Sequence, residues 1–110
     1  MRLWPLFLLA LPACVTSTRV VRLSPTPHEP RPENTAIELY SAHLPRCPFE
    51  EIGIVSAHRE TWLVPGEAVA DALRNRAREL GGDAVVRVGF LTAGELTGTV
   101  VRFKQDDCRE

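Results

Sequence analysis

The chain has 110 residues, 45% of them hydrophobic, and its 13 lysines and arginines nearly balance its 14 aspartates and glutamates. This length is typical of one small domain and excludes a multidomain enzyme. A formal net charge of −1, without a block of either sign, argues against a nucleic-acid-binding surface.

The first 13 residues have the pattern of a secretory signal peptide. Arg2 precedes an apolar run from Leu3 to Ala13, which is too short for a membrane-spanning helix and contains two prolines. Residues 11–14, Leu-Pro-Ala-Cys, resemble the lipobox of bacterial lipoproteins, in which the cysteine thiol receives diacylglycerol. We therefore expect Cys14 to be acylated as the first residue of the mature protein. The alternative is an ordinary signal peptide with a chance cysteine at its end.

Acylation predicts an attachment to the outer membrane. Acyl chains contribute about 0.8 kcal/mol per buried methylene, so the three chains of a lipoprotein attach it to the bilayer permanently. Val15 follows the cysteine, where an aspartate would resemble an inner-membrane retention signal. The expected location is the outer membrane, with the domain either in the periplasm or at the cell surface.

Residues 14–33 are expected to form a Pro-rich, disordered linker behind the lipidated cysteine. Pro25, Pro27, Pro30 and Pro32 are too closely spaced for a helix, because each proline lacks an amide donor and restricts the residue before it. An extended tether of this kind advances roughly 3.1 Å per residue. We expect a stiff, mildly basic spacer between membrane and domain.

Residues 34–110 are predicted to form a small two-layer α+β domain with the order β-β-α-β-β. One helix would pack on one face of a small sheet. The other face would be either solvated or a docking surface. The expected strands are Ala36–Ser41, Phe49–Ala57, Asp83–Gly89 and Leu96–Gln105, and the expected helix is Gly66–Leu80.

Local patterns indicate which side chains these elements bury. In the helix, an apolar stripe recurs at spacings of three and four, and Gly81 and Gly82 supply the stop. In the second strand, Ile52 and Ile54 are expected on one side, and Gly53 is a candidate bulge. The apolar stripe of the helix consists of Val69, Ala72, Leu73, Ala77 and Leu80. In the last strand, Val101 and Phe103 are expected opposite Val100 and Arg102.

Cys47 and Cys108 are expected to form a structural disulfide. Export places both in an oxidising compartment, where an even pair normally becomes a bridge. Closing the loop between them should stabilise the domain by roughly 4 kcal/mol. A redox sensor, or a metal site that also uses His43 and His58, is the alternative, but the chain has no Cys-x-x-Cys pair to support a metal.

Two short sequence segments resemble those of a known family. Residues 48–55 read PFEEIGIV and residues 77–86 read ARELGGDAVV. Together with the lipobox and the basic Pro-rich linker, they resemble the RcsF family of outer-membrane stress-sensing lipoproteins. They are also similar to a wider set of small domains, one branch of which is labelled heavy-metal-binding. RcsF-type domains hold two disulfides, whereas Cys47 and Cys108 allow one.

The resemblance implies a signalling role. In such a system the linker associates with an outer-membrane β-barrel protein and its assembly machinery. Envelope damage then frees the domain to engage an inner-membrane regulator, and a phosphorelay responds.

The sequence contains no motif that requires catalysis. Nucleophile elbows, phosphate-binding loops and His-Glu-x-x-His pairs are missing, so we expect a binding protein without catalytic residues, cofactor or metal. Trp62 is a candidate hot spot, and Arg74 and Arg78 are candidate contacts for an acidic partner. Their alternatives are a packing residue and a solvated helix face.

We therefore expect a membrane-anchored lipoprotein that senses envelope stress and signals by protein–protein binding. The alternatives are a structural or envelope-assembly lipoprotein without signal output, and a metal-binding module.

Overall fold

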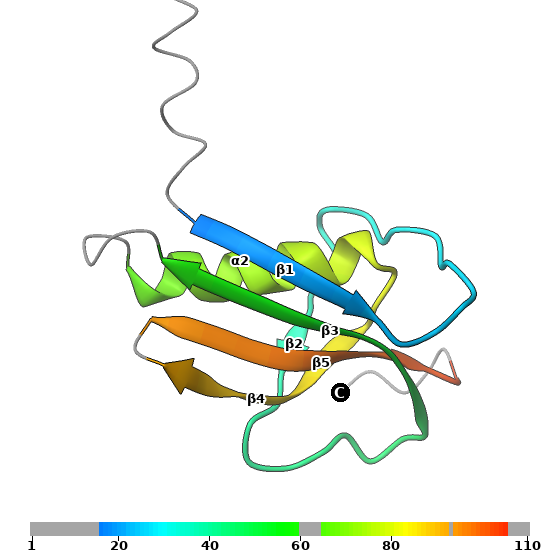
Figure 1. The fold of residues 1–110 in the computed structure, drawn as a ribbon. Coiled ribbons are helices and arrows are strands. Elements are labelled where there is room, and N and C mark those ends of the chain that lie inside the picture. The colour runs from blue at the N-terminus through cyan, green and yellow to red at the C-terminus, as the bar shows by residue number, and fades with distance from the viewer. Residues whose placement is uncertain (1–15, 60–64, 93, 106–110) are drawn as a thin grey trace, which may run out of the picture.

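One helix covers one face of a five-stranded mixed sheet in this computed structural model, which describes residues 16–59, 65–92 and 94–105 (Figure 1). The strand order is β1-β3-β5-β4-β2, and neighbours are antiparallel except for the parallel pair β4 and β2. The predicted small α+β fold is confirmed, with one more strand than expected. The elements are β1 (Thr16–Arg22), β2 (Glu38–Leu39), β3 (Phe49–Arg59), α2 (Gly66–Glu79), β4 (Ala84–Thr92) and β5 (Glu95–Phe103).

The helix packs through the stripe that the sequence predicts. Val69, Leu73 and Ala77 are buried at a spacing of four residues, which brings them onto one side of α2. Leu80, directly after the helix, belongs to the same core. The sheet supplies the opposite side of this core, including the fully buried Val55, Val85 and Val100.

The helix ends as the two glycines predict. Gly81 has a φ of 86°, in the left-handed region that favours glycine. Its N–H donates to the carbonyl of Arg78, and the N–H of Gly82 donates to the carbonyl of Ala77. These two bonds form a Schellman motif, which satisfies carbonyls at the end of the helix and turns the chain into β4.

A bulge in β3 changes which side chains reach the core. The register against β5 shifts between Glu51 and Gly53, so the predicted irregularity near Gly53 is confirmed. The prediction that Ile52 and Ile54 share one side is wrong. Ile52 is buried in the core under the helix, whereas Ile54 is 39% exposed, because the extra residue of the bulge interrupts the alternation.

The sheet face away from the helix is only partly covered. A small second cluster forms there around Tyr40, Val86 and Val101, with Phe49 and Phe103 packed against it. Val100 lies in the helix-side core instead, so the predicted opposition of Val101 and Phe103 to Val100 is confirmed. The cluster lies at the end of β5, where β3 begins.

The first strand corrects the predicted linker. Residues Thr16–Arg22 pair with β3 along their whole length, from Thr16 opposite Arg59 to Arg22 opposite Gly53. Val20 packs against the helix-side core. The expectation of a disordered tether is wrong for this strand, because threonine and valine favour pleated structure and the first proline of the linker comes only at Pro25.

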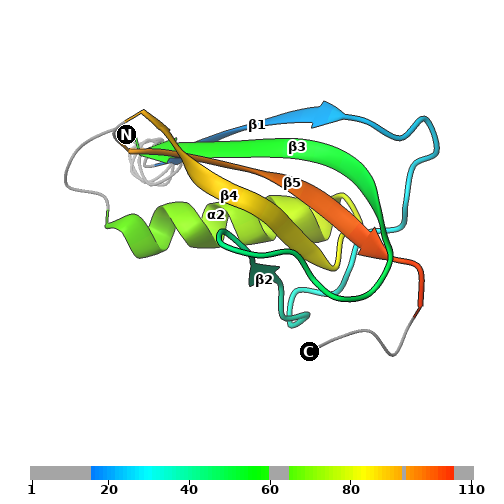
Figure 2. The ribbon, with the colours of Figure 1, turned by 90° about the horizontal axis from the view of Figure 1, so that it is seen from below.

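The chain after β1 crosses the molecule. Because β1 and β2 lie at opposite edges of the sheet, residues 23–37 have to connect the two edges. They pass the C-terminal end of α2, as Figure 2 shows from below. The Pro-rich segment is therefore a connection within the fold.

Candidate functional site

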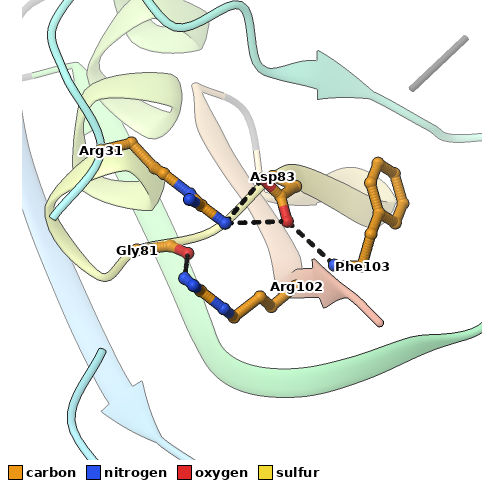
Figure 3. Close-up of polar contacts among 5 residues, drawn as sticks. All are labelled: Arg31, Gly81, Asp83, Arg102 and Phe103. Atoms are coloured by element: carbon orange, nitrogen blue, oxygen red, sulfur yellow. Dashed lines mark hydrogen bonds and ion pairs between the residues drawn. The ribbon is translucent and has the colours of Figure 1, made fainter. Parts of the chain in front are cut away.

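Asp83 is the centre of a buried polar cluster that joins three parts of the chain (Figure 3). It lies directly before β4 and is 6% exposed. Its Oδ2 atom accepts a hydrogen bond of 2.9 Å from the backbone N–H of Phe103. Arg31 Nη2 lies 3.0 Å from Oδ1 and 3.2 Å from Oδ2. A buried carboxylate needs such partners, because an unpaired charge is costly away from water.

Arg102 completes the cluster from β5. Its Nη1 atom donates a hydrogen bond of 2.8 Å to the carbonyl of Gly81 at the end of α2. Arg31 and Arg102 thus hold the two residues that flank Gly82. The cluster fixes the helix end against the sheet, and its chemistry is structural.

The Pro-rich segment is held on the helix end by further bonds. The N–H of Arg31 donates to the carbonyl of Arg78 at 2.8 Å, and Arg78 Nε donates to the carbonyl of Thr35 at 2.6 Å. His28 and Glu29 lie so close to Gly81 that an added Cβ there would meet each at 2.7 Å. This segment cannot extend away from the domain without losing these contacts.

The predicted partner-binding arginines are engaged within the domain. Arg74 forms an ion pair of 2.8 Å with Asp71, and Arg78 donates to Asn75 Oδ1 at 2.6 Å as well as to Thr35. Arg78 thus has a structural role at the Pro-rich segment. Trp62 lies outside the described residues, so its binding role stays a prediction.

Of the three predicted cysteine sites, one lies in the described part of the chain. Cys47, in the loop before β3, is disulfide-bonded. Cys14 and Cys108 lie outside the described residues. The pairing of Cys47 with Cys108 and the acylation of Cys14 therefore stay predictions.

The histidines considered for a metal site lie in separate environments. The ring of His43 packs edge-on against Tyr40, with 5.5 Å between the ring centroids. His58 is hydrogen-bonded to the hydroxyl of Ser17 at 2.9 Å. Within residues 16–59, 65–92 and 94–105, no group of three or more His, Cys, Asp and Glu side chains could hold a metal ion.

Two grooves lie beside α2. One, of about 450 Å³, contains Arg76, which is paired with Glu79 at 2.6 Å. The other, of about 520 Å³, contains Arg31 and Arg78, both bound as described above. Within these grooves, Arg31, Arg76 and Arg78 therefore make contacts inside the domain.

Cys14 lies two residues before β1 in the sequence, and so before the end of the sheet at which β1 begins. Thr16 pairs with Arg59 at the end of β3, and the N–H of Arg59 donates to the carbonyl of Gly94 in the β4–β5 turn. Figures 1 and 2 both show these segments side by side. Two residues span at most about 7 Å, so Cys14 stays close to this end.

Sequence reasoning missed the roles of Asp83 and Arg31. In the sequence, Asp83 is noticeable only as part of the segment LGGDAVV, residues 80–86. Arg31 lies in the predicted linker. An aspartate directly after a helix-ending glycine pair, before an apolar strand, is the signal that could have indicated the cluster. The exposed pair Phe90 and Leu91 at the end of β4 was also missed.

Comparison with protein-family models, with curated proteins and with solved structures finds no match. Among the described residues, no helix is long and apolar enough to cross a membrane.

Proposed function

We propose that the protein is a lipoprotein of the outer membrane that senses envelope stress and acts by binding another protein at the membrane surface. The observation that carries this proposal is the position of the lipobox cysteine, two residues before β1. An acyl group on Cys14 would hold the whole domain beside the bilayer, because β1 is paired with β3 from its first residue.

An exposed apolar pair supports protein binding. Val21 in β1 and Ile54 in β3 lie directly opposite each other and are 58% and 39% exposed. They occupy the sheet face that α2 leaves free. β1 also forms one edge of the sheet, where a strand of a partner can pair.

The resemblance to RcsF-type lipoproteins supports stress sensing. The Pro-rich segment is fixed on the domain, so the described part of it cannot act as a spacer between membrane and domain. A partner in the inner membrane would therefore have to reach a domain held beside the outer membrane. The same constraint favours a second candidate function, a structural or envelope-assembly lipoprotein without signal output, because assembly partners lie in the outer membrane itself.

The two functions predict different responses to damage of the outer membrane. A photoreactive residue at Ile54 in intact cells should form a stress-dependent adduct with a regulator if the protein is a sensor. The same residue at Asp71, on the exposed side of α2, is the matched control. Deleting the gene should then also abolish induction of envelope-stress transcripts. Unchanged transcripts, with Ile54 adducts only to outer-membrane proteins, would favour the assembly function and contradict sensing.

A further inference from the structure

Phe90 and Leu91 are the two most exposed large hydrophobic side chains in the described part of the chain. They are 69% and 67% exposed. Successive residues of a regular strand point to opposite faces. Here the β4–β5 register shifts between Phe90 and Thr92, so Leu91 is an extra residue in the strand. Such a bulge redirects side chains, and it explains how both members of an adjacent apolar pair face solvent.

This apolar pair lies at the end of the sheet where β1 begins. Phe90 pairs with Leu96 across the β4–β5 hairpin. It lies four residues before Gly94 in the hairpin turn. Gly94 in turn accepts the hydrogen bond from Arg59, the partner of Thr16. Figures 1 and 2 both place the β4–β5 turn and the start of β1 at the same end. Three strand spacings separate β1 from β4, which corresponds to about 14 Å.

We propose that Phe90 and Leu91 insert into the bilayer interface beside the acyl chains on Cys14, so that the sheet stands end-on at the membrane. This proposal rests on the acylation of Cys14 in the proposed function. Cys14 reaches at most about 7 Å from Thr16, so the acyl chains enter the bilayer within reach of the apolar pair. Phenylalanine and leucine are the side chains that the apolar face of an interfacial segment carries.

Phe90 and Leu91 would set the orientation of the sheet relative to the bilayer. Acyl chains alone attach a lipoprotein permanently, so Phe90 and Leu91 need not supply affinity. Attachment at Cys14 keeps the pair at a high effective concentration beside the bilayer, which allows a weak contact to be occupied. The opposite end of β1 lies about 20 Å away and would then face away from the membrane. Leu23 and the Pro-rich segment follow β1 at that end.

The test compares two exposed leucines at opposite ends of the sheet. Benzoylphenylalanine replaces Leu91 in one variant and Leu23, which is 45% exposed, in the other. The acylated protein is reconstituted in vesicles of phosphatidylethanolamine and phosphatidylglycerol and irradiated. We expect lipid adducts at position 91 to exceed those at position 23 by about tenfold, because only position 91 would be in contact with lipid. Equal yields at the two positions would overturn the proposal.

A second variant checks the apolar pair without a probe on it. Benzoylphenylalanine is placed at Gly89, where an added Cβ meets open space. F90S/L91S should lower its lipid adducts about tenfold, and an unchanged yield would contradict the proposal. In intact cells, a protein adduct at position 91 in place of lipid would assign the pair to a protein partner and overturn it.

Mass spectrometry of Cys14 in the same samples distinguishes failure of the proposed anchor from failure of the proposed orientation. Acylated protein without lipid adducts at position 91 overturns only the orientation. A chain without an acyl group on Cys14 overturns the anchor and, with it, the orientation that depends on the anchor.

Discussion

Arg31 and Asp83 lie 52 residues apart in the sequence, and their side chains approach to 3.0 Å. This ion pair joins the Pro-rich segment to the residue directly before β4. Together with the backbone bond from Arg31 to Arg78, it makes the segment part of the domain. The first strand and the crossing segment therefore replace the long tether that the sequence suggests.

Replacing Asp83 with asparagine should destabilise the domain by about 1–3 kcal/mol, because Arg31 loses its charged partner while the N–H of Phe103 can still be bonded. Urea unfolding of the purified protein measures the change. Asp71→Asn, at the exposed pair with Arg74, is the control and should cost at most about 0.5 kcal/mol. Equal effects of the two substitutions would show that the Asp83 cluster does not hold the segment.

Gly81→Ala should destabilise the domain by about 1 kcal/mol or more, since the left-handed conformation disfavours a Cβ. The new methyl group would also meet Glu29 and His28 at 2.7 Å. Gly66→Ala adds the same group at the start of α2, where it meets nothing within 4 Å. This control should leave the midpoint of thermal unfolding unchanged or raise it. A harmless Gly81→Ala would contradict the packing of the segment on the helix end.

Val20 and Val21 test whether β1 belongs to the sheet. Val20 packs on the core and Val21 is 58% exposed, so the two side chains point to opposite faces of one strand. Val20→Lys should destabilise the domain by about 1–3 kcal/mol, whereas Val21→Lys should change the free energy of unfolding by about 0.5 kcal/mol or less. A disordered tether would tolerate both, and that result in urea unfolding would refute the strand.

Cys47→Ser should lower the free energy of unfolding by about 2–4 kcal/mol, since Cys47 is disulfide-bonded. If Cys108 is its partner, Cys108→Ser should have the same effect, and the double variant should be no less stable than either single variant. Thiol titration of the denatured protein reports the free cysteine that each single change creates. Additive losses of stability would rule out this pairing.

The helix and the two strands after it could be predicted because their local signals agree. The stripe through Val69, Leu73 and Ala77, the stop at Gly81 and the apolar run of β4 each identify one element without knowledge of its neighbours. A sheet with one covered face is then the arrangement that packing favours.

The first strand and the Asp83 cluster depend on partners far away in the sequence. Thr16 finds its partner at Arg59, and Asp83 finds Arg31 in a segment that has no periodic pattern. The prolines near Arg31 indicate an extended chain in solution and in a packed crossing segment alike. Only the tertiary structure distinguishes a free tether from a packed crossing segment. For the same reason, the pairing of Thr16 with Arg59 at the start of β1 could not be located from the sequence.

The proposed function depends on an acyl anchor at Cys14, two residues before β1. The most direct measurement is mass spectrometry of the N-terminal peptide of the protein purified from the envelope of its native cells. We expect a peptide that begins at Cys14 and carries diacylglycerol and an N-linked acyl chain. A peptide that begins elsewhere, or that contains an unmodified Cys14, would contradict it.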